Sequence, residues 1–279
     1  MRLFWLVALT MSAFALNSIL NRLALAPGDM GPTSFAAIRL LAGASTLVLL
    51  ITLRSQPRPR ISPRTFGSAA MLALYAVGFS FAYITLPTGP GALILFGGVQ
   101  VMSFAITWMR GQHIARLSWL GAMLAFAGLC YLLWPDSAAP VDGYGALLML
   151  AAAFGWTLYT LAGARSTDPL GATGMAFVQA APLGVIVWLV LPDAMSIRGA
   201  ALAVISGALT SGMGYALWYR VLPQLSMPTA AVAQLTVPVI ATLGGALLLG
   251  ETLTLRFVIA TCAVLCGVGV TIYAQRRRG

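Results

Sequence analysis

Residues 108–129, WMRGQHIARLSWLGAMLAFAGL, recur in diverged form at residues 247–268, LLLGETLTLRFVIATCAVLCGV. The register places a Gly-Gln pair of the first stretch on a Gly-Glu pair of the second, and Gly128 on Gly267. Two further alignments keep the same period of about 140 residues, which indicates an internal repeat; they pair residues 11–22 with 151–162 and residues 32–43 with 172–183. We therefore divide the chain into two related halves, residues 1–135 and residues 141–279.

The composition is that of a protein embedded in lipid. Apolar residues make up 60% of the chain and charged residues only 8%, which is roughly a third of the share in a soluble domain. The net charge is +10, but every basic residue is an arginine and most lie between apolar runs, as topology signals do. We expect a multi-pass protein of the inner (plasma) membrane, with the lipid bilayer as its surroundings and no nucleic-acid partner.

Ten apolar runs have the length of about 20 residues that a helix needs to cross a bilayer. They are residues 3–23, 33–53, 65–86, 90–109, 117–134, 143–164, 171–191, 199–222, 227–249 and 255–274. The predicted fold is all-α, with ten transmembrane helices in one membrane domain. The three cysteines lie inside apolar runs, where we expect unpaired packing residues.

The arginines outside the runs predict the orientation. With the N-terminus in the cytoplasm, the outer segments hold only Arg198 and Arg256, and the inner segments hold Arg2, Arg54, Arg58, Arg60, Arg64, Arg110, Arg116, Arg165, Arg220, Arg276, Arg277 and Arg278. By the positive-inside rule both termini are cytoplasmic. Five spans in each half make the repeats inverted, an arrangement typical of alternating-access carriers with a site at mid-membrane.

Three features of the chain are the arrangement of five plus five spans, Arg39 within IRLLAGA, and the stretch LLLGETLTL before the helix with Gly267. In these features the chain resembles the EamA type of the drug/metabolite transporter superfamily. The resemblance covers the whole chain, although Gln112 stands where the second half has Glu251, so this position is not expected to serve chemistry. It implies a carrier whose cavity is lined by spans one, three, four, six, eight and nine. Within the family, the chain is most similar to exporters of amino acids and other metabolites, aromatic amino acids in particular.

The spans that the resemblance assigns to the cavity also hold most of the aromatic and amide residues. Tyr75, Phe79 and Tyr83 are four residues apart and share one helix face. The candidate substrate-binding residues are Asn17, Asn21, Tyr75, Phe79, Tyr83, Gln100, Trp156, Tyr159, Tyr215, Trp218, Tyr219 and Gln234. Pro238 and the pair Gly97 and Gly98 predict pliable or broken helices at matching places in spans nine and four, and are candidate gating residues.

Other interpretations of these residues stay open. Tyr83 and Tyr219 lie near span ends, where aromatic side chains often anchor a helix at the membrane interface. Gln100, Gln234 and Asn17 could simply join helices by hydrogen bonds. The glycines could serve close packing, and His113 in a basic turn is expected to be a solvated loop residue.

The sequence also restricts the energy source and the substrate. A chain without lysine cannot hold a Walker phosphate loop, so ATP is not a partner. Its six acidic residues fall at span ends or in turns, which favours facilitated over proton-coupled transport. Aromatic walls with a few amides suit a small amphipathic molecule, and amino acids fit this description.

Three other functions are alternatives to amino acid export. The alternative carrier is an exporter of drugs or quaternary amines. An intramembrane enzyme would need a cluster of His, Asp or Cys at one depth, and none is present, so no catalytic residue, metal or cofactor is expected. A receptor or subunit without transport activity is disfavoured by the inverted repeat. We expect the chain to act as a monomer.

Arg39 is the one permanent charge well inside a span without an obvious partner. It lies about 9 Å of helix rise from the outer end of span two, so its side chain could reach the interface or backbone carbonyls. Its repeat mate is the uncharged Gln179. We interpret Arg39 and Gln179 as polar residues that brace spans two and seven against the rest of the protein, with substrate contact by Arg39 as the alternative.

Overall fold

The computed structural model describes residues 2–28, 30–53, 63–111, 116–134, 141–163, 166–225, 233–234 and 236–276. These residues contain helices and no strands. The elements are α1 (Arg2–Leu25), α2 (Pro32–Thr52), α3 (Pro63–Thr85), α4 (Thr88–Met109), α5 (Arg116–Leu133), α6 (Gly143–Gly163), α7 (Pro169–Val190), α8 (Ile197–Ile205), η1 (Ser206–Met213), α9 (Gly214–Val221), η2 (Leu222–Gln224), α11 (Thr236–Leu249) and α12 (Leu255–Arg276).

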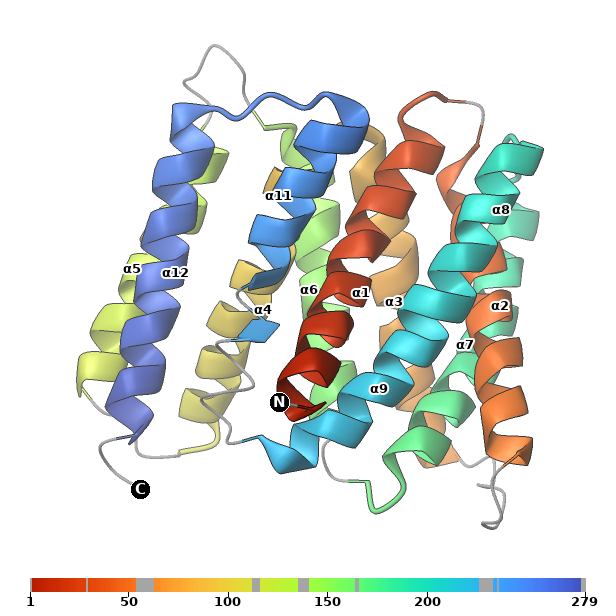
Figure 1. Ribbon diagram of the computed structural model, residues 1–279, viewed down its shortest axis with the longest axis horizontal. Helices are drawn as coiled ribbons and strands as arrows, with labels where there is room; N and C mark the ends of the chain where they lie inside the picture. Colours follow the sequence, from red (N-terminus) through yellow and green to blue (C-terminus); the bar gives the residue numbers. More distant parts are fainter. Residues whose placement is uncertain are drawn as a thin grey trace.

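Within the described residues, eight helical segments are long and apolar enough to cross a membrane, and two shorter apolar helices follow at Thr236–Leu249 and Leu255–Thr271. The helices stand side by side, and α1 begins at the end of the bundle where α12 ends (Figure 1). We call the opposite end, at the top of Figure 1, the distal end. The principal helix pairs are α5 with α12, α3 with α6, and α2 with α7, while α1 packs between α11 and the α8–η1–α9 segment.

The eighth predicted span is not one regular α-helix. Its middle turns, Ser206–Met213, form a π-helix between α8 and α9. The segment SGALTSGM is rich in Gly, Ser and Thr, which are weak α-helix formers. Gly207 also allows α2 to approach closely, because a Cβ atom there would lie 2.2 Å from the carbonyl oxygen of Arg39.

Span four is one continuous helix at its glycine pair, whereas residues 227–232 and 235 of span nine lie outside the described residues. The helix α4 runs without interruption past Gly97 and Gly98, which pack against Leu129 and Ala153. Pro238 lies near the start of the described part of α11 and is buried. The two glycines make close contacts in α4, and among the described residues the π-helix lies in span eight.

The edge pair α5 and α12 is held by small residues. A Cβ atom on Gly267 would lie 2.4 Å from the carbonyl oxygen of Gly121, and one on Gly128 would lie 2.9 Å from the Cβ of Ala263. Such contacts allow the two backbones to approach closely, which is how helices associate in lipid. Cys130, Cys262 and Cys266 on these two helices are unpaired and exposed on the outer surface.

Two helix N-termini at the distal end are capped by carboxylates from the second half of the chain. The N-cap residues of α2 and α4 are Gly31 and Pro87, which provide no side-chain cap. Asp193 accepts hydrogen bonds from the backbone N–H groups of Thr33 (2.7 Å) and Ser34 (3.0 Å) and from the Ser34 hydroxyl. Negative charge at a helix N-terminus also interacts favourably with the helix dipole.

The partly buried Asp193 carboxyl titrates below its ordinary range. Burial alone would raise its pKa, but the hydrogen bonds from Ser34 and Thr33 outweigh burial and lower the pKa from the ordinary value of 3.8. The carboxylate form is therefore the form that binds the N-terminus of α2.

Glu251 performs the same task for α4 and joins it to two further helices. Its two carboxylate oxygens accept from the Thr88 N–H at 2.9 and 2.8 Å, and Oε1 also accepts from the Thr88 hydroxyl at 3.0 Å. Arg22 of α1 lies 3.6 Å from Glu251 and donates to the carbonyls of Tyr83 and Ile84 at the end of α3. This Glu251 network ties α1, α3, α4 and the α11–α12 connection together at the distal end.

Candidate functional site

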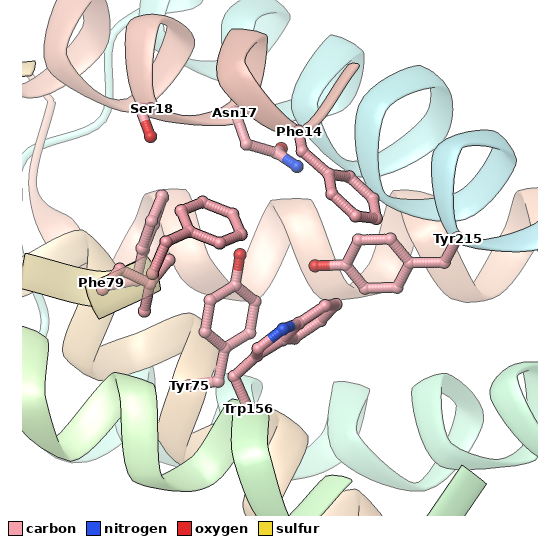
Figure 2. A pocket seen from close by; sticks show the side chains of 9 residues that line it. Phe14, Asn17, Ser18, Tyr75, Phe79, Trp156 and Tyr215 are labelled. Atoms are coloured by element: carbon pink, nitrogen blue, oxygen red, sulfur yellow. The ribbon is translucent and has the colours of Figure 1, made fainter. Parts of the chain in front are cut away.

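A cavity lies between the two halves of the bundle, within the aromatic core (Figure 2). Its volume is about 10 Å³, which is close to what one water molecule requires. The lining side chains come from α1, α3, α4, α6 and α9 and are Phe14, Asn17, Ser18, Tyr75, Phe79, Leu95, Phe96, Trp156 and Tyr215. The spans that line it are five of the six that the resemblance implied.

Aromatic rings enclose the cavity on several sides. Trp156 lies 5.0 Å from Tyr75 and 4.9 Å from Tyr215, measured between ring centroids. Phe14 meets Trp156 and Tyr215 edge to face at 6.0 and 5.6 Å. Contacts of this kind orient the rings and stabilise the cluster by about 0.5 to 1.5 kcal/mol per pair beyond simple burial.

Asn17 connects the cavity wall to the π-helix. Its Oδ1 accepts hydrogen bonds from the hydroxyls of Ser206 (2.9 Å), Thr210 and Ser211 (3.3 Å), and its Nδ2 donates to the Thr210 carbonyl at 3.4 Å. All four residues are buried. In lipid no water replaces such bonds, so this group of hydroxyls and one amide fixes α1 against η1.

The Arg39 side chain of α2 extends toward the residues that line the cavity. Its side chain is only 1% exposed. Nε donates to Ser211 Oγ at 3.0 Å, and Nη2 donates to the hydroxyl oxygens of Tyr75 at 2.9 Å and Tyr215 at 3.4 Å. The guanidinium carbon lies 5.1 Å from the ring centroids of both Tyr75 and Phe79. Arg39 is thus bonded directly to two residues that line the cavity.

Five of the predicted substrate-binding residues line the cavity, namely Asn17, Tyr75, Phe79, Trp156 and Tyr215. Five others are buried without lining the cavity, namely Asn21, Tyr83, Tyr159, Trp218 and Tyr219. Gln100 and Gln234 are half-buried and lie outside the lining. Gln112 and His113 lie outside the described residues.

One alternative interpretation, the interfacial anchor, is wrong for Tyr83 and Tyr219. Tyr83 and Tyr219 are 0% and 6% exposed, so they do not act as interfacial anchors facing lipid. The Tyr83 hydroxyl instead donates to the Thr88 carbonyl at 3.3 Å. Asn21 joins helices, because its Oδ1 accepts from the hydroxyl of Ser80 at 3.1 Å and its Nδ2 donates to the Asn17 carbonyl at 3.0 Å.

The expected path of the Arg39 side chain is also wrong. It reaches neither the interface nor backbone carbonyls, because its hydrogen bonds go to side-chain hydroxyls in the core of the bundle. The reason is that Gly207 brings η1 against α2, which leaves Ser211 and Tyr215 within reach of the guanidinium. Its repeat mate Gln179 accepts a hydrogen bond from Thr65 at 3.0 Å and joins α7 to α3.

The site residues that were not predicted from the sequence carry little chemistry of their own. Phe14 lies three residues before Asn17 and therefore on the same helix face, which could have revealed it. The run Ser206, Thr210 and Ser211 could have been recognised as small polar residues in an apolar span. Leu95 and Phe96 had no signal that sets them apart from other apolar residues of α4.

The fold and this site define a class, a multi-pass helical membrane protein with a closed aromatic and polar cavity between its halves. Residues 143–273 match the EamA-like transporter family. An uncharacterized protein of Pseudomonas aeruginosa is 44% identical over 269 residues, which cover 96% of this chain and 93% of that protein. The chain belongs to the EamA-like transporter family, and its relatives support the drug/metabolite transporter superfamily.

More distant relatives and a solved structure agree. The uncharacterized inner membrane transporter YedA of Escherichia coli is 26% identical and covers 80% of this chain and 76% of its own. The threonine/homoserine exporter RhtA of Salmonella typhimurium is 28% identical, with 88% and 84% covered. A crystal structure with 18% identity superposes with a TM-score of 0.70 over 98% of both chains, which shows the fold. The chain is a multi-pass protein of the plasma membrane.

Proposed function

We propose that this protein is a secondary transporter that exports small amphipathic metabolites, amino acids including aromatic ones first among them, by alternating access. The observation that carries the proposal is the central cavity, in which aromatic rings from α3, α6 and α9 face the amide of Asn17 beside a π-helix. Irregular helices at mid-membrane commonly mark the binding sites of secondary transporters. An exporter of threonine and homoserine among the relatives favours the same substrate class.

The packing of α5 on α12 supports the proposed inverted repeat. In the sequence alignment Gly128 corresponds to Gly267, and Gly121 corresponds to Ala260. Gly267 meets the backbone of Gly121, and Gly128 meets the backbone of Ala260. Each contact is thus the repeat equivalent of the other, as a twofold relation between the halves requires. Ten spans and cytoplasmic termini complete the proposed topology.

The distal contacts suggest how the cavity opens. Glu251 and Asp193 join helix ends of the first half to connections of the second half. In the proposed cycle these contacts break when the distal side, taken as the outer side, opens. The π-helix provides the adaptable segment, Gly97, Gly98 and Pro238 are the proposed gating positions, and Arg39 and Gln179 brace the surrounding helices.

No coupling ion is assigned to the cycle. The acidic residues of the described chain, Asp142, Asp168, Asp193 and Glu251, all lie at helix ends. A proton-coupled carrier usually holds an ionisable relay within the membrane. We therefore propose facilitated transport, with the direction set by the concentration gradient.

Flux of labelled threonine, phenylalanine and tryptophan through proteoliposomes tests the proposal, with and without a pH gradient. We expect saturable flux that the gradient changes less than twofold. Trp156→Ala should reduce flux at least tenfold, whereas Trp108→Ala, on a side chain that is 57% exposed, is the matched control. Saturable flux of a quaternary amine with no flux of any amino acid would establish the drug-exporter alternative instead.

A further inference from the structure

Arg39 is a buried cation without a counter-anion in the described part of the chain. Its Nε and Nη2 donate to hydroxyl groups, and its Nη1 has no hydrogen-bond partner there. The acidic side chains that the structure describes are all at the ends of helices, away from this position. An unpaired buried charge is strongly unfavourable in a membrane, and where one persists it usually marks a functional site.

Two tyrosines connect the guanidinium to the cavity by hydrogen bonds. Because Nη2 donates to the oxygens of Tyr75 and Tyr215, the proton of at least one hydroxyl remains available for a further acceptor. Figure 2 shows both hydroxyl groups pointing into the space enclosed by Phe14, Phe79 and Trp156. A hydroxyl that accepts from a cation is also a stronger donor, since such bonds polarise one another.

We infer that Arg39, Tyr75 and Tyr215 form the carboxylate-binding end of the cavity, and that the transported molecules carry a carboxylate next to an apolar or aromatic part. This inference rests on the proposed function and specifies its substrate class. The tyrosine hydroxyls donate to the carboxylate, and Arg39 provides the opposite charge behind them. Phe14, Phe96 and Trp156 contact the apolar part. A cation such as a quaternary amine is disfavoured by the same charge.

The closed cavity has room for about one water molecule, so a carboxylate enters only when the cavity widens. Asn17 Oδ1 already accepts hydrogen bonds from three hydroxyl groups, and as an acceptor it does not bind an anion. The anion therefore binds on the Tyr75 side of the cavity, whereas Asn17 holds α1 to the π-helix.

Pairs of probes of similar shape, in which a carboxylate is replaced by a neutral carboxamide, test the inference on the purified full-length chain. We would measure binding of benzoate against benzamide, and of L-phenylalanine against L-phenylalaninamide, by tryptophan fluorescence and by thermal shift. Wild type should bind each acid at least tenfold more tightly than its amide. Arg39→Gln should reduce this ratio to near one, and Arg39→Lys should retain part of it. Ser45→Ala on the exposed face of α2 is the control and should leave the ratio unchanged.

A second set of variants protects the test against a folding defect in Arg39→Gln. Tyr75→Phe with Tyr215→Phe keeps both rings and removes both hydroxyls, so it should lower the acid-to-amide ratio at least tenfold. An unchanged ratio in the folded Arg39 variant or in the double tyrosine variant would overturn the inference. An Arg39-dependent preference for benzoate without flux of any amino acid would keep the anion site and reject the proposed function. Amino acid flux with an unchanged ratio would do the reverse.

Discussion

Replacing Glu251 by Ala is expected to open the distal end of the protein. Glu251 accepts the first N–H of α4 and the hydroxyl of Thr88, and it pairs with Arg22 at 3.6 Å. Hydrogen bonds to a charged acceptor contribute about 1.5 to 3 kcal/mol each. The ion pair adds at most about 1 kcal/mol because both side chains are partly exposed. Water that enters the open form replaces more than half of this sum.

We therefore expect Glu251→Ala to destabilise the closed form by about 2 kcal/mol, which corresponds to a change of about 30-fold in the open-to-closed ratio. Spin labels at Tyr144 and Leu253, exposed side chains at the distal end, would report the distance distribution in a variant without the three native cysteines. Glu251→Gln keeps one acceptor oxygen and should give a smaller shift. Thr252→Ala on the neighbouring exposed residue should give none.

An open population of Glu251→Ala within twofold of the wild-type value would contradict a role of Glu251 in closing the distal end. The distal carboxylates would then stabilise individual helices without controlling access to the cavity. Loss of folding is excluded by requiring an unchanged helical circular dichroism signal in every labelled sample.

Three further predictions concern the framework around the cavity. Asn17→Leu should lower the free energy of unfolding in mild detergent by about 2 to 3 kcal/mol, because three buried hydroxyls lose their shared acceptor; a loss below about 0.5 kcal/mol would show that these bonds do not hold α1. Gly267→Leu should prevent α5 from packing on α12 and reduce the yield of folded protein, whereas the exposed Cys266→Leu should not, and equal yields would contradict the packing. Because the pKa of Asp193 is lowered in the folded protein, the free energy of unfolding should decrease as the pH falls below the ordinary pKa of 3.8 toward the lower folded pKa. This decrease with pH should be smaller in Asp193→Asn, and identical pH profiles would contradict the cap on α2.

The pH dependence follows from the sign of the shift at Asp193. The folded protein holds the carboxylate more strongly as an anion than the unfolded chain does, so above the unfolded pKa its full contribution is present. As the pH falls, the unfolded state takes up the proton first, and stability is lost until the folded form is protonated as well.

The sequence was sufficient for the positions of most helices and for the central residues of the cavity. Apolar runs predict spans closely, and Tyr75 and Phe79 were found because residues four apart share a helix face. Asn17 was found because an amide in an apolar helix is conspicuous. These features depend on local pattern alone.

Other features depend on contacts between distant parts of the chain and could not be predicted. The π-helix lies against the backbone of α2 at Gly207, and the Arg39 side chain is directed to Ser211 and Tyr215, more than 170 residues away. The caps of α2 and α4 come from Asp193 and Glu251 in the other half. A local pattern contains no information about any of these partners.

The transported molecule is expected to bind in the aromatic cavity. Ser18 lines the cavity and is 1% exposed, so a Ser18→Cys thiol in a background without the native cysteines reports access to it. The rate of its reaction with a small thiol reagent would be measured in proteoliposomes during exchange of labelled for unlabelled amino acid. We predict at least a fivefold slower reaction at saturating substrate, and an unchanged rate while exchange continues would contradict binding in this cavity.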